Sequence, residues 1–214
     1  VTDDVAPVTG AIAANGASND NKPTFAGAAG SAEAGSTITV MDGATVLGTA
    51  VVAADGSWSV TPTTALADGA HSITTRATDA AGNVSPVSPA LALTVDTAAP
   101  AAPAAPTSTA PSTNDNTPGI HIGVGLTDTP SLYVDGVKVP ATYDPVTGML
   151  TPTTPLADGA HSITTTLTDA AGNESPQSAA LPLTVDTAAP AAPTGVTVTD
   201  DVAPVTGAIA ANGA

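Results

Sequence analysis

The sequence predicts an all-β protein whose antiparallel β-sandwich modules follow one another in an extended string. Three observations lead to this fold class. Short segments rich in Thr, Val and Ile alternate apolar and polar residues, with turn signals about every 8–12 residues, a rhythm typical of β-sandwiches. The acidic residues are almost all aspartate, which favours turns over helices. The chain also repeats itself at the length of a small domain, which predicts modules in series.

Two repeats show how the chain is organised. Residues 198–214 are identical to residues 1–17, with the sequence VTDDVAPVTGAIAANGA. Residues 61–103 and 151–193 align without a gap and differ at only a few positions. We therefore interpret the chain as a window of a tandem array. Its expected parts are module 1 (1–96), an extended Ala/Pro-rich linker (97–112), module 2 (113–186), a second linker (187–195) and the first strand of a following repeat (196–214).

The strands of module 1 follow from residue alternation and turn chemistry. The pairs Asp42-Gly43 and Asp55-Gly56 predict tight turns, and Asp68-Gly69 predicts a third. We expect strands near residues 1–13, 23–28, 36–41, 45–53, 57–61, 71–78 and 88–95. On the last two of these strands, alternate residues should share one face, namely His71, Ile73, Thr75 and Ala77 opposite Leu91, Leu93 and Val95.

Module 2 repeats this pattern except at its start. The turns recur at Asp135-Gly136 and Asp158-Gly159. In place of the opening seventeen residues, however, it has only the Pro-containing segment TSTAPST at residues 107–113. We therefore expect its first strand to be short, irregular or missing.

Charge and composition exclude several functions. Nineteen acidic residues face three basic ones, giving a net charge of −16, and such a surface repels nucleic acids and anionic membranes. The chain has no cysteine, so neither disulfides nor thiolate chemistry contributes. It has no apolar run long enough to cross a bilayer, so we expect no membrane insertion in this segment.

Several motifs in a fixed order resemble a known family. They are LADGAH at residues 66–71, TDAAGN at 78–83 and VDTAAP at 95–100, each with a copy in module 2. These segments resemble the bacterial Ig-like repeats of giant biofilm adhesins, the Bap-like and RTX-type surface proteins of Gram-negative bacteria. The resemblance implies Ig-like β-sandwiches in an extracellular stalk on the bacterial surface, often stiffened by calcium near domain junctions. It also implies that neighbouring repeats are the partners, while other domains bind any glycan or host ligand.

The carboxylates are candidate calcium ligands. Calcium takes six to eight oxygen ligands from Asp, Asn, backbone carbonyls and water. Aspartates that precede glycine are explained as turn residues, whereas the others lie at strand ends near the module poles, where so much like charge would otherwise repel itself. The candidates are Asp3, Asp4, Asp20, Asp79, Asn83, Asp96, Asp115, Asp128, Asp169, Asn173, Asp186, Asp200 and Asp201. The alternative interpretation treats them as solvated charges or caps.

The order of strands in an Ig sandwich predicts which candidates meet. The loop after the sixth strand lies at the end where the chain enters, and Asp96 lies where it leaves. In a string, the trailing end of one module faces the leading end of the next. We therefore expect Asp96 to approach Asp128 and Asp169 across the junction.

The histidines predict structural roles rather than catalysis. His71 and Ser72 are adjacent on a strand and point to opposite faces, so Asp68, His71 and Ser72 cannot form a relay. His71 and His161 occupy the position of the corner tyrosine of Ig-like folds, where a ring donor bonds nearby backbone. His121 has no other metal ligand close in sequence, which argues against zinc.

Three functions remain from the sequence. The first is a stalk or spacer of a surface adhesin, acting in cell adhesion and biofilm formation and stiffened by calcium. The second is direct binding of a glycan or protein, although an aromatic cluster for it is missing. The third is a self-assembling filament in which residues 198–214 supply the strand that another chain's second module lacks. An enzyme has the least support, because no nucleophile, acid/base pair or cofactor loop is recognisable.

Overall fold

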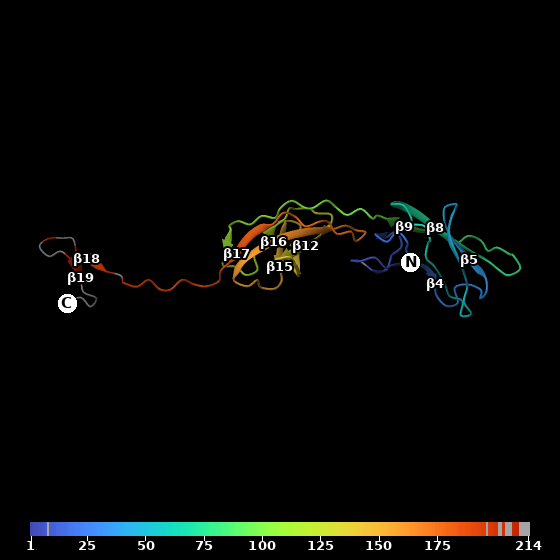
Figure 1. Cartoon of the computed structure of the whole chain (residues 1–214), viewed down its shortest axis with the longest axis horizontal. Coiled ribbons are helices and arrows are strands. Elements are labelled where there is room, and N and C mark those ends of the chain that lie inside the picture. Colours follow the sequence, from blue (N-terminus) through green and yellow to red (C-terminus); the bar gives the residue numbers. More distant parts are fainter. Residues whose placement is uncertain (8, 196, 201–202, 204–206, 210–214) are drawn as a thin grey trace.

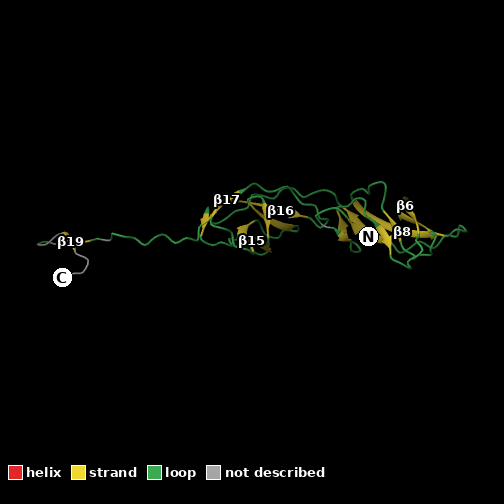
Figure 2. Ribbon diagram, turned by 60° about the horizontal axis from the view of Figure 1, so that its bottom comes forward, coloured by secondary structure: helices red, strands yellow, loops and turns green. Residues whose placement is uncertain are grey.

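A computed structural model describes residues 1–7, 9–195, 197–200, 203 and 207–209 of the chain. Two β-sandwich modules lie end to end along the long axis, and an extended segment leads from the second toward the C-terminus (Figure 1). Every regular element of the described residues is a strand (Figure 2). No helix in this part of the chain is long and apolar enough to cross a membrane. The predicted all-β fold class is confirmed.

Module 1 packs a large sheet against a small one. The large sheet has the order β3-β9-β8-β5-β6, the small sheet pairs β4 with β7, and a separate hairpin pairs β1 with β2. The strands are β1 (Thr2–Asp3), β2 (Gly10–Ala11), β3 (Ala17–Ser18), β4 (Phe25–Gly27), β5 (Thr37–Asp42), β6 (Thr45–Val51), β7 (Trp58–Val60), β8 (Gly69–Thr78) and β9 (Leu91–Val95). Between them lies a core that includes Phe25, Val40, Ile73, Leu93 and Val95.

Module 2 also packs a five-stranded sheet against a smaller one, which here has three strands. Its sheets have the orders β10-β17-β16-β12-β13 and β11-β15-β14. The strands are β10 (Ser112–Thr113), β11 (Ile120–His121), β12 (Thr129–Val134), β13 (Val137–Val139), β14 (Ala141–Asp144), β15 (Met149–Pro152), β16 (Gly159–Thr168) and β17 (Leu181–Val185). Its core is the cluster of Ile120, Leu132, Val134, Leu150, Ile163 and Leu183. Beyond it, β18 (Val198–Asp200) pairs with β19 (Gly207–Ile209).

The opening segment differs from the prediction. A single strand over residues 1–13 is wrong, because β1 and β2 form a short antiparallel hairpin. The Asp3 carboxylate accepts a hydrogen bond from the Val5 amide at 2.8 Å, a side-chain turn that reverses the chain. Gly10 has a φ of 119°, which only glycine adopts readily. These turn residues outweigh the alternating Val and Thr residues around them.

The first edge strand of each sandwich runs parallel to its last strand. In module 1, β3 pairs with β9, and in module 2, β10 pairs with β17. β10 has only two residues, which confirms that the first strand of module 2 is short. Thr107 also pairs with His121. Module 2 therefore begins at about residue 107, inside the range 97–112 that was predicted to be linker. β10 occupies the sheet edge that β3 occupies in module 1, whereas module 2 has no counterpart of the β1–β2 hairpin among the described residues.

The turn at Asp55-Gly56 gives a first prediction. Gly56 has a φ of 84°, and a Cβ there would lie 2.7 Å from the Gly30 amide nitrogen and 2.8 Å from the Gly30 Cα. Backbone atoms cannot rotate away, so we expect Gly56→Ala to destabilise module 1 by about 1–3 kcal/mol through overpacking in addition to backbone strain. Urea unfolding followed by Trp58 fluorescence measures this. Gly43→Ala is the matched control, because its φ is also positive but its Cβ meets open space, and an equal loss in both variants would refute the steric argument.

Candidate metal centre at the module junction

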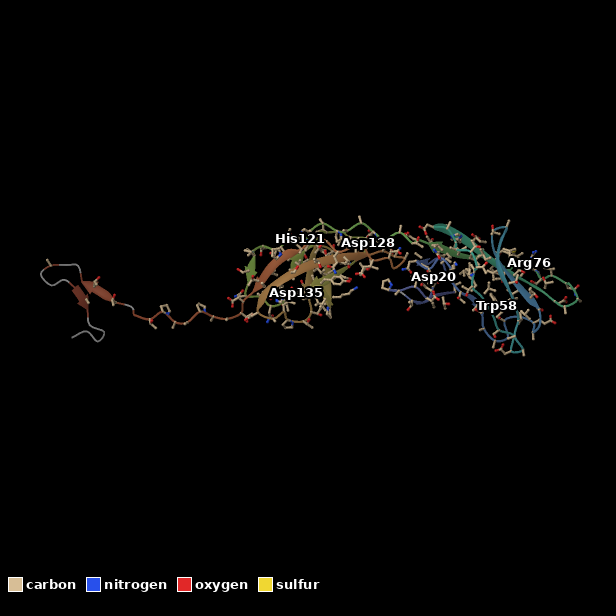
Figure 3. All side chains as sticks on the ribbon, viewed as in Figure 1. Asp20, Trp58, Arg76, His121, Asp128 and Asp135 are labelled. Atoms are coloured by element: carbon tan, nitrogen blue, oxygen red, sulfur yellow. The ribbon has the colours of Figure 1, made fainter. Side chains whose placement is uncertain are left out.

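The candidate site lies where the trailing end of module 1 faces the leading end of module 2. We call the end that carries Asp96 or Asp186 the trailing end of a module, and the end that carries the TDAAGN loop the leading end. Figure 3 shows Asp20 on the side of module 1 toward module 2, whereas Trp58 and Arg76 lie farther away. The junction therefore combines residues that are distant in sequence.

Among the described residues, two hydrogen bonds cross the junction. The Asn19 amide donates to the Ala171 carbonyl at 3.0 Å. The Asn173 side-chain amide donates to the Asp96 carbonyl at 2.7 Å. Both bonds use the TDAAGN loop of module 2 on one side and the ends of β3 and β9 on the other. The loop that contains Asp169 thus lies beside Asp96 as expected, and the bridging group is the Asn173 amide. The second predicted neighbour, Asp128, makes no hydrogen bond to Asp96 within the described residues.

Comparison of the two TDAAGN loops shows how much the junction covers. In both modules the loop has the same sequence and the same internal hydrogen bonds. In module 1, residues 81–83 are exposed. In module 2, Ala171 is only 3% exposed and Asn173 only 9% exposed. Since the local structure is the same, the difference is due to contact with module 1.

The aspartate of each TDAAGN loop accepts hydrogen bonds from its own loop. The Asp79 carboxylate accepts hydrogen bonds from the Ala81 amide, the Asn83 amide and the Asn83 side chain at 2.8–2.9 Å. These bonds, first of all that from the Asn83 side chain, hold the pKa of Asp79 below its ordinary value. Asp169 accepts the same three bonds from Ala171 and Asn173. Their oxygens are thus already engaged within the protein.

The inner side of the junction is a buried polar network from module 1. The Ser18 hydroxyl donates to the Asp3 carboxylate at 2.6 Å and accepts from the Asp20 amide at 3.1 Å. The Asp96 amide donates to the Ser18 carbonyl at 3.0 Å. Asp3, Ser18 and Asp20 are all less than one tenth exposed. The β1–β2 hairpin therefore brings a second buried carboxylate to the side of Asp20.

Two oxygen atoms in this network have no partner. One carboxylate oxygen of Asp20 accepts from the Lys22 amide at 2.8 Å, but its Oδ2 is buried without any hydrogen bond. The side-chain oxygen of Asn19 is buried and unpartnered as well. Leaving such groups dry costs about 1–3 kcal/mol each, and more for a charged group. Carboxylate and amide oxygens are calcium ligands, so these residues fit that ion by their chemistry.

The structure brings only part of the predicted ligand set to this junction. Asp3, Asp20, Asp96, Asp169 and Asn173 belong to it. Asp79 and Asn83 lie at the other end of module 1, since β8 runs antiparallel to β9. Asp115 and Asp186 follow the paired ends of β10 and β17 at the trailing end of module 2, and both are exposed. Asp4 is exposed. Asp128 lies at the leading end of module 2, because the adjacent Thr129 pairs with Thr168, and it accepts a weak bond from Thr127 at 3.4 Å. Asp201 lies outside the described residues, as does the side chain of Asp200.

In the part of the chain that the structure describes, acidic side chains alone do not form a metal site. Within the described residues, no group of three or more His, Cys, Asp or Glu side chains is placed to hold a metal. A calcium ion at this junction must therefore take ligands from the Asn19 amide oxygen, backbone carbonyls and water in addition to Asp20. Ser18 and Asn19 were not among the predicted ligands. Asn19 does belong to an Asn-Asp-Asn (NDN) motif at residues 19–21, which recurs at residues 114–116 and by itself is only a weak signal.

Each corner histidine lies between a backbone carbonyl and a carboxylate, with the same arrangement in both modules. His71 Nε2 lies 2.7 Å from the Ala67 carbonyl, and His161 Nε2 lies 2.9 Å from the Ala157 carbonyl, which confirms the predicted backbone contact. The sequence did not predict their second partners, the carboxylates of Asp42 and Asp135, at 2.7 and 2.8 Å from Nδ1. Both nitrogens of each ring face an acceptor, so only the doubly protonated imidazolium satisfies both.

Protonation of His71 and His161 should make the stability of the modules depend on pH. Burial lowers the pKa of His71, but its hydrogen bonds to Asp42 and Ala67 outweigh this and raise the pKa above the ordinary value. The bond to Ala157, then that to Asp135, raises the pKa of His161. A raised folded-state pKa stabilises below about pH 6.5, the unfolded value, and this contribution is lost as the pH rises through the folded value.

We therefore expect the free energy of unfolding to decrease from pH 6 to pH 8, by about 1 kcal/mol per module, the net worth of one hydrogen bond. Urea unfolding at both pH values in EDTA measures it. In the double variant His71→Gln and His161→Gln the decrease should disappear. An unchanged pH dependence in that variant would assign the effect to other groups.

The fold and the junction define a class of protein, a string of β-sandwich modules with a polar contact between consecutive modules. A family model, bacterial Ig-like domain, matches residues 2–97 and 105–187. The chain therefore belongs to the bacterial Ig-like domain family, which confirms the resemblance drawn from its motifs. No curated protein matches the chain.

Solved structures share the architecture at low identity. The fibronectin(III)-like modules of CbhA from Clostridium thermocellum are 16% identical, with a TM-score of 0.53 over 86% of this chain and 93% of that one. A Ca²⁺-stabilised adhesin that helps an Antarctic bacterium bind ice is 24% identical, with a TM-score of 0.41 over 88% of this chain and 49% of that one. The BSP domain of a biofilm-associated protein is 21% identical, with a TM-score of 0.29 over 84% of this chain and 30% of that one.

Proposed function

We propose that the chain is a stalk segment of a bacterial surface adhesin, in which calcium at the module junction limits bending. Its role is mechanical and extracellular: it holds a binding domain away from the cell. One observation carries the proposal, namely the buried and unpartnered oxygens of Asp20 and Asn19 at the contact between two modules. Membership of the bacterial Ig-like family and the end-to-end arrangement support it.

Calcium would bind residues of module 1 at the point where they contact module 2. Asp20 and Asn19 would hold the ion, and the Asn19 backbone already binds the Ala171 carbonyl of module 2. Neutralising charge there also relieves the repulsion between the buried carboxylates of Asp3 and Asp20. Any separation of the modules would expose this network to water and lower its affinity for the ion. Binding and stiffness are therefore linked.

The expected stabilisation is modest but useful. A site with a dissociation constant of about 10⁻⁴ M, as extracellular modules have, adds roughly 1.4 kcal/mol at millimolar calcium. The free energy of unfolding of a small domain is about 5–15 kcal/mol. A contribution of this size at each occupied junction changes how often the contact opens, by about tenfold.

Thermal unfolding tests the proposal, because the modules have separate optical probes. Trp58 reports module 1, while Tyr133 and Tyr143 report module 2. We expect millimolar calcium to raise the melting temperature of module 1, which contributes Asp20, relative to EDTA. Magnesium is the control, because it demands a tighter octahedral geometry and gives up its water reluctantly. Equal melting temperatures in EDTA, magnesium and calcium would refute a calcium-stabilised stalk.

A further inference from the structure

In each module, the first linker residue is bonded to the aspartate of an Asp-Gly pair. We propose that this contact anchors the outgoing linker, so that tension along the string acts on the body of the module before it can peel off the last strand. The inference rests on the stalk role of the proposed function but not on calcium. It gives a mechanical role to Asp68 and Asp158, which the sequence explains only as turn residues.

The anchor is one carboxylate that accepts both donors of one threonine. Asp68 Oδ1 accepts hydrogen bonds from the Thr97 amide and the Thr97 hydroxyl, each at 3.0 Å, and the hydroxyl also lies 3.1 Å from Oδ2. In module 2, the Thr187 amide and hydroxyl lie 3.1 and 2.9 Å from Asp158 Oδ1. Hydrogen bonds to an ionised carboxylate are roughly twice as strong as neutral ones. The linker is therefore held through two atoms of its first residue.

The contact belongs to the module and not to its neighbour. Asp68 and Asp158 lie directly before β8 and β16, whereas Thr97 and Thr187 lie two residues after β9 and β17. The partners are 29 residues apart in both modules. Beyond the first contact the chain continues along module 2, and beyond the second it continues as an extended segment, yet the bonds are the same (Figure 1). The anchor is thus a property of each module.

The loop that carries Asp68 is itself held at two points. Before it, Leu66 is 7% exposed in the core, and its amide donates to the Asn21 carbonyl at 2.8 Å. After it, His71 Nε2 lies 2.7 Å from the Ala67 carbonyl. The corresponding distances in module 2 are 2.7 and 2.9 Å. A load on the linker is therefore passed to the core and to β8 through a loop that is fixed on both sides.

Without the anchor, the load would act directly on the end of β9. Val95 is the last residue of β9, is only 1% exposed, and pairs with β8 on one side and β3 on the other. β3 has only two residues, so few bonds hold β9 on that side. Among the described residues 98–106, the Ala98 amide bonds back to the Asp96 carboxylate, which is a turn within the outgoing chain itself. Thr97 is thus the residue through which the body of module 1 holds the linker.

Constant-force unfolding of single molecules of the 214-residue chain in EDTA tests the inference, because forced unfolding is governed by the unfolding rate. The two events differ in the length released, since the module matched at residues 2–97 frees more chain than the one matched at 105–187. We expect Asp68→Ala to raise the unfolding rate of module 1 about tenfold and to leave module 2 unchanged. Asp158→Ala should do the reverse.

Asp55→Ala is the matched control. Asp55 Oδ1 also accepts from the amide and the hydroxyl of one residue, Ser57, at 2.9 and 2.7 Å, but that residue is only two positions away. This variant loses bonds of the same kind without releasing the linker, so its rate of forced unfolding should stay within about twofold of the original. Thr97→Ser keeps both donors and should unfold like the original chain.

The possible failures are distinguishable. Equal acceleration of module 1 by Asp68→Ala and Asp55→Ala would overturn the anchor, because the effect would then be a general loss of stability. Unchanged rates in Asp68→Ala and Asp158→Ala would overturn it as well. Since the experiment is done in EDTA, either result leaves the calcium-stiffened junction standing. Equal melting temperatures in EDTA and calcium would instead refute the calcium site and leave the anchors intact.

Discussion

Truncation of Ile163 to alanine is expected to destabilise module 2 by about 2–5 kcal/mol, the usual cost of a cavity in a packed core. Ile163 is completely buried on the central strand β16, within a core of only a few aliphatic side chains. A module of this size has few other contacts to compensate. The change should lower the melting temperature of module 2 by at least about 8 °C.

The measurement is thermal unfolding followed by Tyr fluorescence for module 2 and by Trp58 fluorescence for module 1. Val146→Ala is the matched control, because Val146 is 84% exposed, and its effect should stay within about 0.5 kcal/mol. Trp58 should report nearly unchanged unfolding in the Ile163 variant, since the modules have separate cores. A parallel loss in both signals would show instead that the two modules unfold as one unit.

Replacement of Asn173 by alanine is expected to uncouple the modules. The Asn173 side chain donates to the Asp96 carbonyl of module 1 and to the Asp169 carboxylate of its own loop. Its removal leaves both acceptors short of a partner at a covered site, at a cost of about 1–3 kcal/mol. Most of this cost is relieved if the junction opens to water. Small-angle scattering should therefore show a broader, more bent distribution of shapes.

Asn83→Ala is the control that the chain itself provides. Asn83 makes the same bond to its own loop aspartate, but it is exposed at the leading end of module 1. Its removal should loosen that loop without changing the scattering profile. If both variants scatter alike, the bond from Asn173 to Asp96 does not set the angle between the modules.

Much of the fold was predictable because the signals are local. Asp-Gly pairs and alternating Val, Ile and Thr residues determine turns and strands over a few residues. Thus β5 and β6 lie where the residues around Asp42-Gly43 predict them, and Ile73 and Leu93 share the buried face. The hairpin of residues 1–13 was missed because the Asp3 turn competes with an alternating pattern that equally favours one long strand.

The site was less predictable, because an aspartate in a sequence does not show what its oxygens bind. Asp79 and Asp169 are predicted metal ligands, and the sequence did not predict that Asn83 and Asn173 bond their carboxylates within the loop. Asp20 and Asp115 occupy the same NDN motif, but only the first is buried. That difference depends on the hairpin that covers Asp20 and on the contact with module 2. Both are tertiary features.

The measurement that tests calcium-limited bending most directly is the distance distribution between two spin labels placed across the junction. The chain has no cysteine, so Val46→Cys and Val146→Cys, at exposed positions of the two modules, give unique attachment sites. Double electron–electron resonance in millimolar calcium should give one narrow distribution of distances between the labels. In EDTA or magnesium the distribution should be clearly broader. Equally broad distributions in all three conditions would contradict a calcium-stiffened junction.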